Sequence, residues 1–305
     1  MKLRFCRANI LENYHEHVDG AIYKEEAWGF NWLLTTVGIS MILVSKGPFR
    51  RCLELSDVIV GMLDNNMAAV ERNESKDYKT VEVLNTTFQL LPTYILLGLW
   101  DRASNLMRTL RFDVWDAPFL DGLWAGIADS YGPCLGSKQA VSLYINLMLF
   151  VLKGSSVASP EKVLSLLKPP ETIVSLSQTH WARCVGNGSL LYIAALAAER
   201  IQQDDLAEFF AERSEDIHLQ SAVLAGCRAV RARIAARKDD RDAAVRLWQS
   251  GATLVMEHKL PLYAVRLGQD CAGEEGKQIL EEAATAMGSD PTDFDGLPGL
   301  MAPCT

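Results

Sequence analysis

The sequence lacks the short motifs on which an assignment of activity usually depends. Its seven cysteines include no Cys-x-x-Cys pair, which argues against a zinc ribbon, a dithiol redox motif and a disulfide framework. It contains no His-Glu-x-x-His and no Gly-x-Ser-x-Gly, and the segment Gly273–Lys277 lacks the spacing and the hydroxyl residue of a phosphate loop. The sequence therefore predicts no catalytic residue and no cofactor.

The densest group of potential metal ligands consists of His15, Glu16, His17 and Asp19. Two imidazoles hold one metal ion only if they share a face, and on a helix positions two residues apart point in different directions. The surrounding residues do not alternate as a strand would. We interpret the group as a solvated polar patch and predict no metal site.

Basic residues are fewer than acidic residues, and the formal net charge is −8. Net negative charge repels a phosphate backbone, so we predict no nucleic-acid partner. No apolar run of signal-peptide length follows Met1, and the widely spaced cysteines fit a reducing compartment. We therefore expect a cytoplasmic protein.

Charged residues are missing altogether from residues 27–45. A run of this length approaches what is needed to span the hydrocarbon core of a membrane, and Lys46, Arg50 and Arg51 follow it as a basic flank would. The run also holds Asn31 and several threonine, serine and glycine residues, which favour a helix buried on all sides within a helical protein. Membrane association through residues 27–45 is kept as an alternative.

Proline and glycine interrupt the chain at intervals that leave segments of helix length. These segments are rich in good helix formers, and their apolar residues recur three and four positions apart, as in Cys227, Val230 and Ile234. Ser159 followed by Pro160 is typical of a helix N-terminus. No Asn-Gly or Asp-Gly pair lies between two alternating runs. We therefore predict an all-α fold.

The composition changes along the chain and divides it into three parts. Residues 1–155 are aromatic and strongly apolar, and we expect an apolar helical region there. From about residue 188 to residue 287 the chain is rich in Ala, Arg, Glu and Asp, and we expect a helical-repeat region over residues 156–287. Residues 288–305 hold too few apolar side chains to offset the entropy cost of ordering, so we predict a disordered tail.

One arrangement of small and large residues occurs twice in the second part. Ala244 follows a short polar turn and is followed by the large Trp248, and the small Ala232 precedes Ala244 by twelve positions. Ala195 and Ala207 repeat the twelve-residue offset one period earlier. Two antiparallel helices approach closely only where one side of the contact is small, so these offsets favour a helical hairpin.

This arrangement resembles the tetratricopeptide repeat, and the resemblance covers residues 190–287. It implies antiparallel helix pairs that stack into an α-solenoid, because a single pair cannot bury its apolar stripe. An irregular helical bundle without repeats is the alternative.

In such a stack, the first helix of each pair lines a groove. The resemblance implies that the partner-binding residues are Tyr192, Glu199, Arg200, Arg233 and Arg237. Arginine and tyrosine on a groove suit an acidic peptide segment. We therefore predict a non-enzymatic scaffold that binds another protein. The alternatives are an enzyme with dispersed catalytic residues in the N-terminal half, and membrane association as above.

Overall fold

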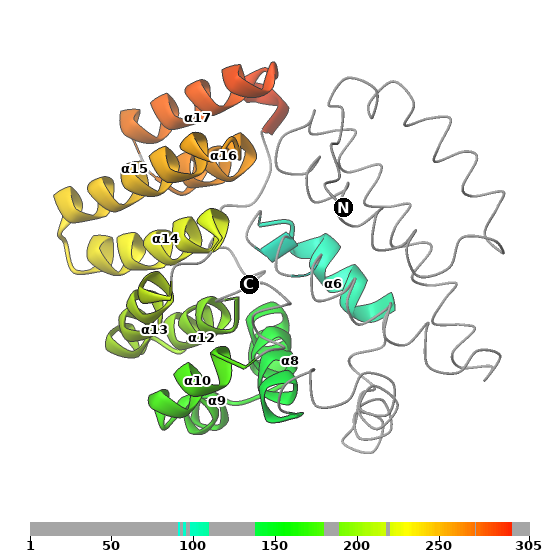
Figure 1. The fold of residues 1–305 in the computed structure, drawn as a ribbon. Coiled ribbons are helices and arrows are strands. Elements are labelled where there is room, and N and C mark those ends of the chain that lie inside the picture. The colour runs from blue at the N-terminus through cyan, green and yellow to red at the C-terminus, as the bar shows by residue number, and fades with distance from the viewer. Residues whose placement is uncertain are drawn as a thin grey trace, which may run out of the picture.

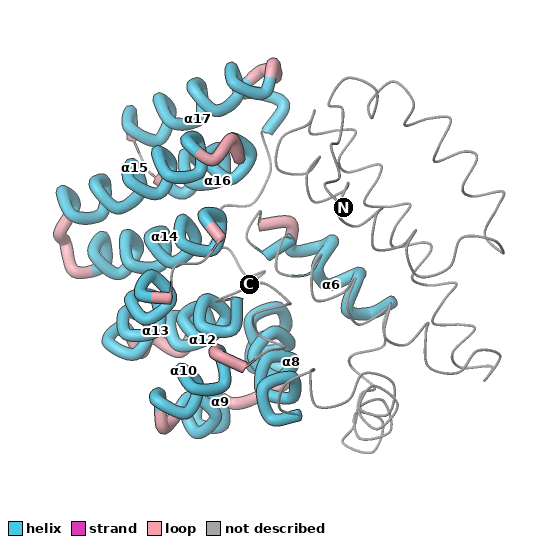
Figure 2. Tube along the Cα trace, in the orientation of Figure 1, coloured by secondary structure: helices cyan, strands magenta, loops and turns pink. Residues whose placement is uncertain are grey.

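The structure is a computed structural model of the 305-residue chain, and it describes residues 91, 94–95, 98–109, 138–179, 189–217, 220–271 and 273–294. Every regular element in these ranges is a helix (Figure 2). The predicted all-α fold is therefore confirmed for this part of the chain. The uncharged run 27–45, the group at residues 15–19 and most of the region 1–155 lie outside the described residues.

Six consecutive helices form three pairs, each joined by a short turn (Figure 1). The pairs are α12 (Ser189–Arg200) with α13 (Asp204–Asp216), α14 (Ser221–Arg237) with α15 (Arg241–Glu257), and α16 (Pro261–Asp270) with α17 (Glu274–Met287). Helix α14 contacts both α12 and α16, and α15 contacts α17. Neighbouring pairs therefore pack on each other in chain order. We refer to α12, α14 and α16 as the first helices, and to α13, α15 and α17 as the second helices.

Small residues lie where helices of the pairs approach one another. The four alanines of the repeated offset are fully buried: Ala195, Ala207, Ala232 and Ala244. A Cβ on Gly251 of α15 would lie 3.3 Å from Leu267 Cδ1 and 3.6 Å from the carbonyl oxygen of Ala225. Helix α15 thus passes close to both neighbouring first helices, which requires a small side chain at this position.

The turns that end α12 and α14 have the same conformation. Gln202 and Asp239 adopt left-handed φ values of 58° and 62°. The next amide in each turn donates to the carbonyl five residues earlier, from Gln203 to Ala198 at 3.0 Å and from Asp240 to Ala235 at 2.9 Å. This is the hydrogen bond of a Schellman C-cap, and it satisfies a carbonyl that the helix end leaves free.

Three further helices precede the pairs. They are α8 (Lys138–Lys153), α9 (Pro160–Leu167) and α10 (Pro170–Ser177), with the 3-10 turn η2 (Gly154–Ser156) after α8. Ser159 Oγ accepts a hydrogen bond from the amide of Lys162 at 3.3 Å, so the predicted N-cap is confirmed. Helix α10 contacts α12 and α13 and thus extends the stack beyond its α12 end. Helix α6 (Trp100–Thr109) contacts α8.

The first helices are buried far more completely than the second helices. Every residue from 190 to 199 in α12 and from 261 to 268 in α16 is buried. Helices α13, α15 and α17 each keep an exposed face of mostly polar residues. A helix that lined an open groove would keep one side free of contacts, so the all-round burial of α12 and α16 means that both sides of these helices are covered.

Helices α16 and α17 meet at two glycines. A Cβ on Gly268 would lie 2.8 Å from both the oxygen of Gly276 and the nitrogen of Leu280, and a Cβ on Gly276 would overlap the carbonyl oxygen of Cys271. The sequence predicts the last helix from Lys277, with a turn before it. The helix begins at Glu274 instead, so that boundary is wrong, and Gly276 lies in the first turn of α17 because the close contact with α16 requires glycine.

The chain beyond α17 returns to α16. Gly288 ends α17 with a left-handed φ of 65°, and Asp290 Oδ1 accepts hydrogen bonds from Thr292 at the start of the 3-10 turn η3 (Pro291–Phe294). Phe294 is fully buried, and its carbonyl oxygen accepts a hydrogen bond from Gln269 Nε2 at 2.7 Å. Residues 288–294 of the predicted tail therefore have a defined place, and residues 295–305 lie outside the described residues.

Within the described ranges, no helix combines the length and the apolar composition that crossing a membrane requires. In the same ranges, no group of three or more His, Cys, Asp and Glu side chains is arranged to hold a metal ion. Cys227 and Cys271 are free thiols, and both are buried.

Candidate functional site

Most of the predicted groove residues meet in a buried cluster of charges. We name as the charged cluster six residues that hydrogen bonds link across the three helix pairs: Glu199, Asp204, Arg233, Arg237, Trp248 and Asp270. They belong to α12, α13, α14, α15 and α16. The charged cluster therefore connects every pair of the stack.

Glu199 lies at the centre of the charged cluster, and its side chain is 2% exposed. Arg233 Nε donates to Glu199 Oε1 at 3.1 Å and Arg233 Nη2 donates to Oε2 at 2.7 Å. Arg237 Nη1 donates to Oε1 at 3.0 Å. Two parallel hydrogen bonds between a guanidinium and a carboxylate are strong and directional, so they hold α12 and α14 at one relative position.

Two further carboxylates connect the charged cluster to the other helices. Asp270 Oδ2 accepts hydrogen bonds from Arg233 Nη1 and from Trp248 Nε1, both at 3.1 Å. Asp204 Oδ1 accepts from Arg237 Nη2 at 2.7 Å. Arg233 of the middle pair is thus bonded to the first helices on both sides of it.

Burial and ion pairing have opposite effects on the pKa of Arg233. Burial alone would lower its pKa, but the carboxylates of Glu199 and Asp270 raise the pKa above its ordinary value. Tyr192 is fully covered near the charged cluster, and burial is the main cause that raises its pKa. At neutral pH, Arg233 is therefore charged and Tyr192 is neutral.

Arg200 lies apart from the charged cluster. Its Nη1 donates to the carbonyl oxygen of Val151 at 2.6 Å, and its guanidinium carbon lies 5.8 Å from the ring centroid of Phe150. A guanidinium over an aromatic face is attracted by the ring quadrupole. Arg200 therefore joins α12 to the C-terminal end of α8.

The structure brings Glu199, Arg233 and Arg237 together and buries Tyr192 beside them. Of these four side chains only Arg237 is substantially exposed, at 41%. Partner binding by Tyr192, Glu199, Arg200, Arg233 and Arg237 stays a prediction. Their contacts within the chain give all five a structural role.

Sequence reasoning missed Asp204, Trp248 and Asp270 as members of the charged cluster. A signal for Asp270 was present, because it follows Arg233 by 37 positions, the interval that also separates Ala207 from Ala244. Extending the repeat by one more period leads from Arg233 to Asp270. No comparable signal existed for Asp204 or Trp248, whose partners depend on how adjacent pairs pack.

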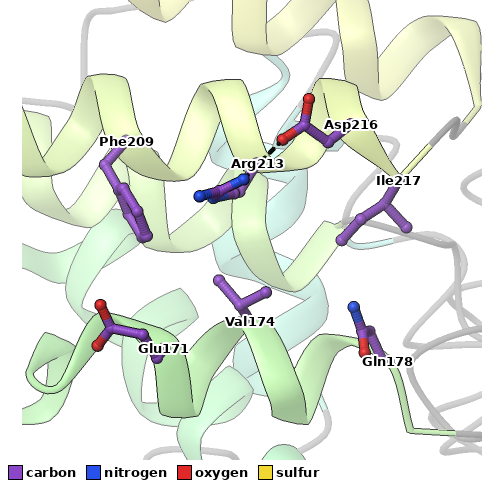
Figure 3. A pocket seen from close by; sticks show the side chains of 7 residues that line it. All are labelled: Glu171, Val174, Gln178, Phe209, Arg213, Asp216 and Ile217. Carbon is purple, nitrogen blue, oxygen red and sulfur yellow. Dashed lines mark hydrogen bonds and ion pairs between the residues drawn. The ribbon is translucent and has the colours of Figure 1, made fainter.

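An open groove lies between α10 and α13. We name as the α10–α13 groove the cavity of about 350 Å³ that seven residues line: Glu171, Val174, Gln178, Phe209, Arg213, Asp216 and Ile217. Figure 3 shows Phe209 of α13 and Ile217, the residue directly after α13, at the two ends, with Val174 of α10 between them. These three apolar side chains are half-buried, whereas the polar and charged ones are exposed, so the groove has an apolar floor and a polar rim.

The charges on the rim of the α10–α13 groove are partly paired. Arg213 Nη1 donates to Asp216 Oδ2 at 3.0 Å, and its guanidinium carbon lies 5.5 Å from the ring centroid of Phe209. The Arg213 and Asp216 side chains are 52% and 63% exposed, so this pair remains in contact with solvent. The rim therefore presents both signs of charge around an apolar centre.

Comparison of the chain with protein-family models, with curated protein sequences and with solved structures finds no match. The arguments for a function therefore come from the geometry of the chain itself.

Proposed function

We propose that the chain is a non-enzymatic, tetratricopeptide-like α-solenoid scaffold that binds a segment of another protein in the α10–α13 groove. The observation that carries the proposal is this groove, which combines a half-buried apolar floor with an exposed charged rim. Interaction surfaces typically have an apolar centre within a polar rim.

The order of the helix pairs supports the solenoid part of the proposal. The first helices pack on one another in succession, and the second helices α15 and α17 do the same. The turns at Gln202 and Asp239 are equivalent in conformation and stand at equivalent places in successive pairs. Repetition of both packing and turn geometry is what an array of helical hairpins requires.

The groove suits an amphipathic segment with one or two large apolar side chains. At about 350 Å³ the cavity is near the lower end of the range for ligand pockets, and its rim is open to solvent. Arg213 offers a cation, and Glu171 and Asp216 offer anions, to polar residues that flank the apolar ones. The acidic segment predicted for Arg233 and Arg237 is not part of this proposal, because both guanidinium groups already have carboxylate partners.

Affinity capture with the full-length chain, followed by mass spectrometry, tests the proposal. Val174→Glu places a charge on the groove floor, and Val157→Glu is the matched control because Val157 is 40% exposed and does not line the groove. We expect the wild-type chain and Val157→Glu to capture the same partner, and Val174→Glu to lose it while its thermal unfolding midpoint stays close to that of the control. Equal capture by both variants, or no partner for the wild-type chain, would refute the proposal.

A further inference from the structure

The two helices that form the α10–α13 groove run in the same direction. Glu171 of α10 lies opposite Phe209 of α13 at one end, and Gln178 lies opposite Ile217 at the other end (Figure 3). Gln178 and Ile217 are the C-caps of α10 and α13, so both helices finish at the same end of the groove. The carboxyl ends of helices carry partial negative charge, which favours a positive group at that end.

The spacing of the lining residues suits a helical occupant. They recur at intervals of three and four positions and form one stripe along each helix: Glu171, Val174 and Gln178 from α10, and Phe209, Arg213, Asp216 and Ile217 from α13 and its C-cap. The stripe on α10 covers about 10 Å, or two turns of helix. Two helices that present apolar side chains between them accept the apolar face of a third helix.

The acidic residues of α13 are compensated from within the chain. Helix α13 contains six of them, and five pair with basic residues of α14: Asp204, Asp205, Glu208, Glu212 and Glu215. The sixth, Asp216, pairs with Arg213 on the rim of the groove. These carboxylates therefore do not require a partner from outside.

Glu171 is a carboxylate of the groove without a compensating cation. It is exposed, and its side chain forms no ion pair with any other residue that the structure describes. Helix α10 contains no Lys or Arg, and Arg213 is bonded to Asp216. The N-terminal dipole of α10 compensates about half of a unit charge, so the carboxylate can still pair with a cation. The groove therefore presents negative charge at both of its ends.

We propose that the partner segment is a basic amphipathic helix that lies antiparallel to α10 and α13, packs its apolar residues on Val174, Phe209 and Ile217, and pairs a Lys or Arg of its last turn with Glu171. This inference rests on the proposed function of the α10–α13 groove. In the antiparallel direction, the positive N-terminal end of the partner helix meets the two helix C-termini. A cation in the last turn also suits the partner's own helix dipole, so one orientation satisfies both ends of the groove.

Fluorescence anisotropy of labelled peptides, titrated with the full-length chain, tests the chemistry and the orientation. Three helical peptides of about 16 residues share two leucines four positions apart. They differ in one charged residue, which is Lys in the last turn, Lys in the first turn, or Glu in the last turn. We expect the chain to bind the first peptide about fivefold more tightly than the second and about tenfold more tightly than the third.

Reversal of the charge at Glu171 locates the ion pair. In Glu171→Lys, the affinities for the last-turn Lys and last-turn Glu peptides should become equal within about twofold, or their order should reverse. Glu161→Lys is the matched control, because Glu161 is exposed, follows a proline at the start of α9 as Glu171 does in α10, and does not line the groove. The control should keep the tenfold preference. An equal change in both variants would indicate general attraction to the net charge of −8 and would overturn the inference.

The remaining outcomes separate this inference from the proposed function. If the three peptides bind equally, or the Glu peptide binds best, while Val174→Glu still loses the captured partner, the basic helix is wrong and the groove remains the binding site. Tighter binding of the first-turn Lys peptide overturns the antiparallel orientation and the pairing with it. Absence of binding by all three peptides at about 1 mM overturns the inference as well.

Discussion

Glu199→Gln is the substitution that tests the charged cluster most directly, because it changes the charge of the central acceptor and almost nothing of its volume. The carboxylate accepts two hydrogen bonds from Arg233 and one from Arg237. A carboxamide keeps one acceptor oxygen and points an NH₂ group at a guanidinium N–H. Arg233 would then stay buried with Asp270 as its remaining counter-ion.

The expected loss follows from the burial of the pair. The Glu199 and Arg233 side chains are 2% and 9% exposed, so solvent cannot replace the lost interaction. Removing one partner of a buried ion pair costs about 3–5 kcal/mol, and we expect Glu199→Gln to lower the free energy of unfolding by that amount. Urea denaturation followed by far-UV circular dichroism at neutral pH measures this free energy. The slope of the free energy against urea concentration should stay unchanged, which indicates that the variant unfolds in the same transition.

Arg237→Gln is the control within the same cluster. Its side chain is 41% exposed, so its pairs with Glu199 and Asp204 are partly screened, and we expect a loss of about 1 kcal/mol or less. In the Glu199→Gln background the effect of Arg237→Gln should shrink, because one of its partners has changed. A loss below about 1 kcal/mol for Glu199→Gln, or an equal loss for both variants, would refute the view that buried pairing holds the first helices together.

Two further predictions concern close packing and burial. Gly276→Ala should lower the free energy of unfolding by about 3 kcal/mol, because the added Cβ would overlap the main chain of Cys271. Gly288→Ala should lower it by about 1 kcal/mol, because only the left-handed φ of 65° is unfavourable there. Urea denaturation of both variants therefore separates a steric clash from backbone strain. Burial raises the pKa of Cys227 from 9.0 to about 12, which lowers its thiolate fraction at pH 8 roughly a thousandfold. Iodoacetamide should therefore leave Cys227 unmodified in the native chain and alkylate it in denaturant, as peptide mass spectrometry can show; rapid native labelling would contradict its burial.

Features that depend on one helix, or on one repeated hairpin, could be predicted from the sequence. The cap at Ser159 and the buried alanines at 232 and 244 needed only local patterns and a twelve-residue offset. These predictions are confirmed because the physics that determines them acts within or between adjacent helices.

Features that depend on which part of the chain covers a given helix face could not be predicted from local patterns. The helical offset puts Arg233 on one side of α14, but whether that side meets solvent depends on the rest of the chain. Gly276 was interpreted as part of a turn, because glycine in a turn and glycine at a tight helix contact look the same in sequence. The α10–α13 groove arises from the packing of a short helix that begins at Pro170, and no local pattern encodes that angle.

The position of Arg233 has a consequence for how the stack comes apart. Arrays of helical hairpins with contacts only between neighbours can fray from an end, one hairpin at a time. Here a single guanidinium in the middle hairpin is shared by a carboxylate from the hairpin before it and one from the hairpin after it. Unfolding of either end hairpin removes one counter-ion from this buried guanidinium. Partly unfolded states of the stack are therefore destabilised. The three hairpins should consequently melt together in one step.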